Sequence, residues 1–73
     1  MASIYRVSYG ALYQTAGVNL YSDRRKAIAR GYQTSGDYPY VVITETTSDG
    51  RSRGVAEWRD RKRVGIADNW VTL

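Results

Sequence analysis

The sequence predicts an α+β fold in which one short helix packs on a mainly antiparallel sheet of about five strands, in the order ββαβββ. Residues 3–9 alternate in character, and residues 40–47 are rich in β-branched and aromatic side chains, as in strands. Residues 22–33 carry helix-start residues followed by helix formers. Because the connections between these segments are short, neighbouring antiparallel strands are favoured.

The first two strands are expected to form a hairpin over residues 4–21. In SIYRVSY, Tyr5 and Tyr9 fall on the same side of a period-two pattern, and both are expected to be packed. Gly17 marks a turn or bulge, and the apolar residues after it begin a strand that returns along the first.

The helix is expected to begin at Ser22, whose hydroxyl can accept a hydrogen bond from the first turn. Asp23 then lies at the positive end of the helix dipole, and Gly31 is placed to end the helix, although Tyr32 and Gln33 could extend it by half a turn. A helix of about ten residues is marginal alone, so it has to dock on the sheet. Its expected docking residues are Ala27, Ile28, Gly31 and Tyr32.

A three-strand meander is expected after the helix. The turn-rich segment 34–39 contains the one proline and leads into a strand over residues 40–47. Asp49-Gly50 is a hairpin signal, and the next strand is expected to bury Trp58. After a tight turn at RDRK, the segment RVGIA predicts a fifth strand, and the apolar tail DNWVTL is expected to pack. No linker interrupts the pattern, so residues 1–73 are expected to form a single domain.

The composition argues against an enzyme. The chain has no cysteine and no histidine, and its seven carboxylates are spread singly. Nucleophilic thiols, the commonest general base and the commonest metal ligands are therefore missing, so neither a metal nor another cofactor is expected. No apolar run approaches a membrane span and the first residues lack a signal-peptide pattern, which predicts a soluble cytoplasmic protein without a membrane partner.

Positive charge is concentrated in two segments, although the net charge is only +4. The first predicted basic patch lies on the helix and contains Arg24, Arg25, Lys26 and Arg30. The second lies around the RDRK turn and contains Arg59, Arg61, Lys62 and Arg63. Either patch is explained by a solvated surface or by contact with an acidic protein surface or with phosphates. Cations near a helix start are disfavoured by the dipole, which favours a functional reason for Arg24 and Arg25.

Tyrosine is the third unusual feature, because the chain has seven tyrosines and no phenylalanine. Tyrosine offers a large rigid face with a polar tip and is enriched at interfaces. The residues expected near loops, and therefore as aromatic partner contacts, are Tyr13, Tyr38 and Tyr40. No RNA- or DNA-binding signature accompanies them.

The order of a strand pair, the helix YSDRRKAIARGY, a hairpin and a tryptophan-containing tail resembles small bacteriophage proteins that redirect host machinery. One such group is the phage RNA-polymerase regulators, including the inhibitor and antiterminator type of a lytic Xanthomonas phage. A second group is the anti-CRISPR proteins. The resemblance implies a non-enzymatic regulator that acts in the bacterial cytoplasm on a host protein complex, RNA polymerase being favoured. The alternatives are an anti-CRISPR-type inhibitor and direct nucleic-acid binding through the arginine clusters.

Overall fold

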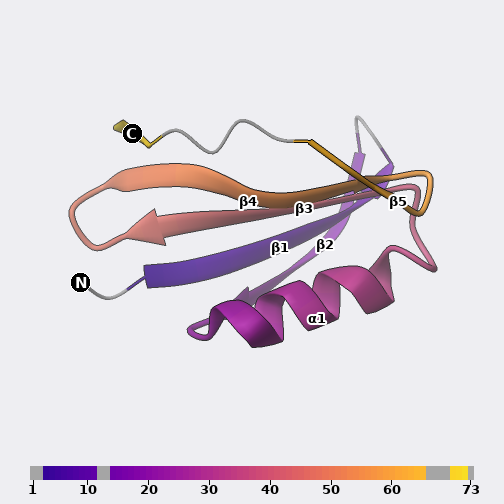
Figure 1. Cartoon of the computed structure of the whole chain (residues 1–73), viewed down its shortest axis with the longest axis horizontal. Coiled ribbons are helices and arrows are strands. Elements are labelled where there is room, and N and C mark those ends of the chain that lie inside the picture. The colour runs from indigo at the N-terminus through magenta and orange to yellow at the C-terminus, as the bar shows by residue number, and fades with distance from the viewer. Residues whose placement is uncertain (1–2, 12–13, 66–69, 73) are drawn as a thin grey trace.

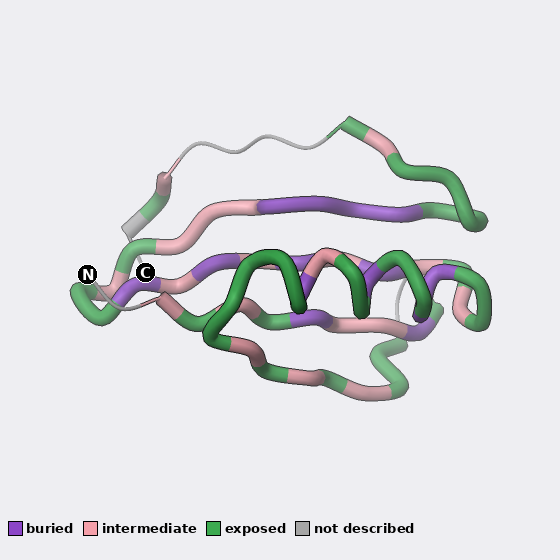
Figure 2. The backbone as a smooth tube through the Cα atoms, turned by 60° about the horizontal axis from the view of Figure 1, so that its bottom comes forward, coloured by how far each residue is buried: buried purple, intermediate pink, exposed green. Residues whose placement is uncertain are grey.

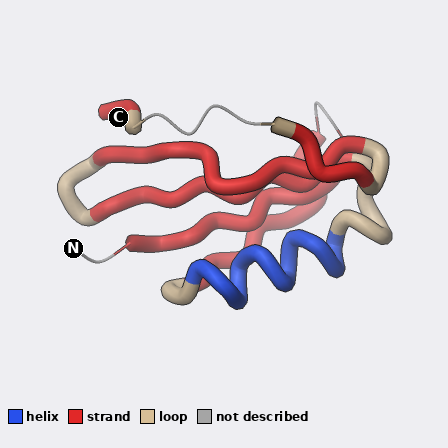
Figure 3. The backbone as a smooth tube through the Cα atoms, viewed as in Figure 1, coloured by secondary structure: helices blue, strands red, loops and turns tan. Residues whose placement is uncertain are grey.

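The computed structural model describes residues 3–11, 14–65 and 70–72, and one helix lies against an antiparallel sheet (Figures 1 and 3). The elements are β1 (Ser3–Ala11), β2 (Gln14–Tyr21), α1 (Arg24–Thr34), β3 (Tyr40–Thr47), β4 (Arg51–Arg59), β5 (Lys62–Val64) and β6 (Val71–Thr72). The strand order is β2-β1-β3-β4-β5, and β6 also pairs with β4. The predicted α+β class is confirmed, and the predicted order agrees with β1 to β5. In the tail that was expected to pack, Val71–Thr72 forms the short strand β6, and residues 68–69 and 73 are outside the described ranges.

The core lies between α1 and one face of the sheet. Val7 on β1 is opposite Ile43 on β3, and Val41 on β3 is opposite Trp58 on β4. The three aliphatic side chains have no exposed surface, and Trp58 is 3% exposed, which confirms its predicted burial. Each such side chain stabilises the fold by about 1.5–3 kcal/mol when fully buried. Figure 2 shows that the buried residues follow the central strands and the inner side of the helix.

The helix begins one residue later than expected. Asp23, and not Ser22, is the N-cap, because its backbone is extended and its Oδ1 accepts a hydrogen bond of 2.9 Å from the backbone N–H of Arg25. At the other end, α1 continues three residues beyond Gly31 to Thr34, and Ser35 caps it. The predicted N-cap was therefore wrong by one residue, and the helix ends one residue beyond Gln33, the farthest extension expected.

Gly31 lies inside the helix because it lets α1 approach the sheet closely. A Cβ at this position would lie 2.7 Å from Cζ3 of Trp58 and 2.8 Å from Cδ1 of Ile43. The buried residues of the helix are Ala27, Gly31 and Thr34. Tyr32 was expected to dock on the sheet, but it is 72% exposed, because its side chain lies about 100° around the helix from Gly31.

Two tight turns connect the last strands. The predicted Asp49-Gly50 hairpin is present, with Gly50 at a φ of +86°. The turn between β4 and β5 has Asp60 at a φ of +50° and Arg61 at +69°, as in a type I′ turn. The fifth strand was expected over residues 63–67 but is observed at Lys62–Val64; residues 66–67 are outside the described ranges. Within those ranges, α1 is too short to cross a membrane.

Candidate functional site

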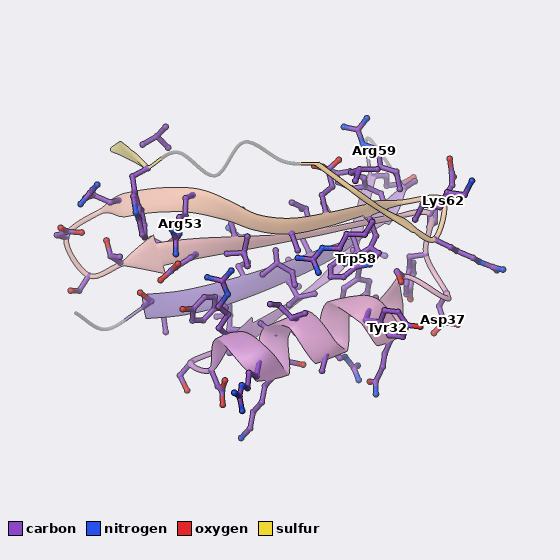
Figure 4. All side chains as sticks on the ribbon, viewed as in Figure 1. Tyr32, Asp37, Arg53, Trp58, Arg59 and Lys62 are labelled. Carbon is purple, nitrogen blue, oxygen red and sulfur yellow. The ribbon has the colours of Figure 1, made fainter. Side chains whose placement is uncertain are left out.

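The structure places the predicted cations at two separate ends of the molecule. Arg24, Arg25 and Lys26 lie in the first turn of α1, at the end that follows β2. The second predicted patch surrounds the β4–β5 turn, close to the C-terminal end of α1 (Figures 1 and 4). The helix has 11 residues, which corresponds to about 16 Å. Arg24 to Lys26 and the second patch therefore present separate surfaces, whereas Arg30, in the second half of α1, lines a hollow with Tyr38 near the second patch.

A groove of about 610 Å³ lies between α1 and the strands β4 and β5. Its lining residues are Ile28, Ala29, Tyr32, Gln33, Trp58, Arg61 and Arg63. The helix packs mainly on the first three strands of the sheet order and contacts β4 less, so it leaves part of this face uncovered. The groove combines apolar and aromatic side chains with two guanidinium groups, which is the composition of a site for an apolar group with carboxylates beside it.

The fold itself positions the two arginines of the groove. Arg63 is the cross-strand partner of Trp58, and its guanidinium carbon lies 5.6 Å from the centre of a Trp58 ring. Arg61 is the second central residue of the type I′ turn. A hydrogen bond of 2.8 Å from the backbone N–H of Asp60 to the carbonyl oxygen of Pro39 holds this turn against the preceding loop. Among the described residues, Arg61 and Arg63 form no salt bridge.

The other cations of the second patch face away from the groove. Arg59 is opposite Tyr40 on β3 and Lys62 on β5, so these three residues share the sheet face that α1 does not cover. Arg59 forms an ion pair with the buried carboxylate of Glu57, and this hydrogen bond raises the pKa of the arginine. Its guanidinium carbon also lies 5.8 Å from the centre of the Tyr40 ring. The structure therefore separates the predicted residues Arg59, Lys62 and Tyr40 from Arg61 and Arg63.

The remaining predicted residues lie beside the groove or outside the described ranges. Tyr38 is half-buried, and its ring centre lies 4.8 Å from that of Tyr9. These two rings line a neighbouring hollow of about 310 Å³ together with Arg30 and Asp37. Tyr13, the third predicted aromatic contact, is outside the described residues.

Acidic side chains border the groove at the same end of the molecule. Asp37 and Asp60 line a hollow of about 270 Å³ that shares Arg61 with the groove. Figure 4 shows Asp37 in the loop that follows the C-terminal end of the helix. A ligand that extends from Arg61 toward this hollow would meet carboxylates, so the positive surface is interrupted there.

A second polar cluster lies toward the other end of the sheet and stabilises the fold. Arg53 Nε lies 3.0 Å from Glu45 Oε1, and the Tyr5 hydroxyl donates a 3.2 Å hydrogen bond to Glu45 Oε2. Burial disfavours the carboxylate, but hydrogen bonds from Ser3, Arg53 and Tyr5 outweigh it and lower the pKa of Glu45. The Arg53 guanidinium also lies 4.6 Å from the centre of a Trp70 ring. In the described part of the chain, no three His, Cys, Asp or Glu residues gather as a metal site.

The sequence-based predictions missed Tyr32 and Ile28 as groove residues. The signal that could have found them is the spacing of Ala27, Gly31 and Thr34, three small residues that mark one stripe of the helix. That stripe places Tyr32 beside the packed surface. No protein-family model matches the chain, and no curated protein or solved structure shows significant similarity to it.

Proposed function

We propose that the protein is a non-enzymatic regulator that binds an acidic surface of a bacterial host protein complex through the groove between α1 and β4–β5. The observation that supports this proposal is one apolar groove bordered by two guanidinium groups, Arg61 and Arg63. RNA polymerase is the proposed complex, on the basis of the resemblance to phage regulators of transcription. In this proposal the protein acts in the cytoplasm and inhibits or modulates transcription.

The groove suits a partner segment that carries an apolar or aromatic side chain next to carboxylates. Half-buried Ile28 and exposed Ala29 offer apolar surface, and each buried Å² of it contributes about 25 cal/mol. The planar guanidinium groups can then bind carboxylates through paired hydrogen bonds. Tyr32 adds a large exposed ring, and such residues contribute strongly at interfaces.

Nucleic-acid binding is the second candidate function, because an exposed tyrosine beside two arginines can stack on an unpaired base. The neighbouring carboxylates favour the protein partner instead. A phosphate backbone is a continuous line of negative charge, and Asp37 and Asp60 would repel it next to Arg61. A protein surface, in contrast, can carry carboxylates only where they meet Arg61 and Arg63, and none where they would meet Asp37 and Asp60.

Binding to purified bacterial RNA polymerase tests the proposal. The double variant Arg61→Glu/Arg63→Glu should weaken binding at least about tenfold, because it places like charges across the interface. The matched control is Arg24→Glu/Arg25→Glu, which makes the same change in charge at the other end of α1. This control should keep the fold, the affinity and any effect on a transcription assay in vitro.

Two results would overturn the polymerase proposal. The first is equal loss of binding in both double variants, since the groove would then have no special role. The second is no binding to polymerase together with tight, strongly salt-dependent binding to DNA or RNA. In that case the slope of log affinity against log salt would report the number of phosphates contacted.

A further inference from the structure

In the part of the chain that the structure describes, the strand β2 forms one edge of the sheet. In the strand order it pairs only with β1, whereas β5 and β6 cover parts of the opposite edge strand β4. Its eight residues, QTAGVNLY, include no charge and no proline. Natural edge strands normally carry such groups, because unpaired backbone N–H and C=O groups otherwise recruit another strand.

A bulge protects only the first half of this strand. The register between β1 and β2 shifts after Tyr9, which leaves Gly17 to Tyr21 in regular pairing. Figure 2 shows β2 as the outer strand, where no residue is buried. The regular half therefore presents five residues whose outer backbone edge has no partner among the described residues.

This half of β2 also exposes apolar side chains on the sheet face away from α1. Val18 is opposite Ser8 and Leu20 is opposite Arg6, on the side of the strands away from Val7. Val18 is 39% exposed and Leu20 is 65% exposed. An added strand would pack side chains against both of them and satisfy the free backbone groups at the same time.

We propose that β2 pairs with β2 of a second copy of this chain, antiparallel, about a two-fold axis that runs through Asn19 at right angles to the sheet. This register places Leu20 opposite Val18 of the second copy, and the reverse, so that two apolar cross-strand pairs form on one face. The pairing involves only Gly17 to Tyr21, the half of β2 without the bulge, because Tyr21 faces Gly17 of the second copy. The two sheets become continuous, and both helices lie on the same face.

The distribution of charge limits the repulsion between two copies in this orientation. A chain of net charge +4 repels its copies wherever cations meet, and β2 carries none. Arg24 to Lys26 follow β2 closely, and an antiparallel pair places the two sets of cations on opposite sides of the axis. The two copies of Tyr21 lie four residues apart along the strand direction, which is roughly 13 Å. The two strand ends that lead to the cations are therefore farther apart than the Debye length, which is about 8 Å at physiological ionic strength.

Sedimentation velocity over a range of protein concentrations tests the pairing. The wild-type chain should dimerise reversibly, and more strongly as salt rises, because screening weakens the repulsion between two cationic copies. Leu20→Lys should remain folded by circular dichroism and become monomeric. The matched control is Val71→Lys. Val71 is 56% exposed, and it lies on β6, away from β2. The Val71→Lys variant should still dimerise.

Disulfide cross-linking through one introduced cysteine tests which residues of the two β2 strands face one another. The chain has no cysteine of its own, so no other disulfide can form. Residues that face one another across an antiparallel pair lie about 4.5–5.5 Å apart at Cα, within the range that a disulfide spans. Asn19→Cys should therefore form a covalent dimer on oxidation, and Val71→Cys should not. The amide nitrogen of Asn19 has no hydrogen-bond partner among the described residues, so its replacement loses no such bond.

A wild-type chain that stays monomeric at all concentrations overturns the proposal, as does a Leu20→Lys dimer or equal cross-linking of the two cysteine variants. These results do not depend on the groove. The Arg61→Glu/Arg63→Glu variant should still dimerise, so failure of the polymerase proposal is distinguishable from failure of this one.

Discussion

Replacing Arg61 by glycine should make the protein more stable and a weaker binder. Arg61 has a φ of +69° in the turn between β4 and β5, a conformation that L-residues rarely adopt. Its side chain makes no hydrogen bond or salt bridge with the described residues, so the change removes no such contact from the fold. With Asp60 before it, the new turn would be Asp-Gly, a preferred type I′ sequence.

The magnitude follows from two opposing backbone terms. The left-handed conformation costs an L-residue about 1–2 kcal/mol. Glycine avoids this cost, but its greater freedom in the unfolded chain removes about 0.5–1 kcal/mol of the gain. The free energy of unfolding should therefore rise by about 0.5–1 kcal/mol. In a domain of this size that corresponds to an increase in Tm of about 3–6 °C.

Thermal unfolding followed by circular dichroism measures this effect, with Arg61→Ala as the control. Alanine also removes the guanidinium but keeps the Cβ that makes the turn unfavourable, so its Tm should stay near that of the wild type. Both variants should bind the proposed polymerase partner more weakly, because each loses one cation of the groove. Equal Tm values for the glycine and alanine variants would refute the reasoning, since the positive φ would then carry no cost.

Two further predictions concern the interior of the fold. The lowered pKa of Glu45 means that its stabilising effect is complete above the ordinary value of 4.5 and is lost as pH falls through the folded-state pKa. Urea unfolding from neutral pH to about pH 3 should show this loss in the wild type, and a weaker pH dependence in Glu45→Gln. Gly31→Ala should destabilise the fold by about 1–2 kcal/mol, because the contact of the new Cβ with Trp58 outweighs the higher helix propensity of alanine. An increase in the urea midpoint of this variant would contradict the close packing of α1 on the sheet.

Local patterns predicted the strands well and the helix boundaries less well. The alternation around Tyr5 and Tyr9 and the run over residues 40–47 are local signals, and both segments are strands. Gly31 was interpreted as a helix end because glycine commonly follows a helix. Its actual environment depends on Trp58 and Ile43, which are distant in the sequence, so no local pattern could reveal it.

The candidate site was predicted in part for the same reason. The cations of the RDRK turn were identified, but only Arg61 and Arg63 line the groove, since strand pairing decides the face on which each side chain lies. Tyr32 was expected against the sheet because it was placed near the same helix face as Ala27, Ile28 and Gly31. Its position beside Arg61 depends on how α1 lies relative to β4 and β5, which the sequence pattern alone does not determine.

The close contact between α1 and β4 also constrains how this sequence can evolve. The Trp58 ring occupies the space that a side chain at position 31 would need, so a larger residue at position 31 requires a smaller one at position 58. A lineage that changes one position first passes through a protein with either a steric clash or a cavity. In an alignment of relatives, the two positions should therefore change together, and glycine at position 31 should accompany the largest aromatic residues at position 58.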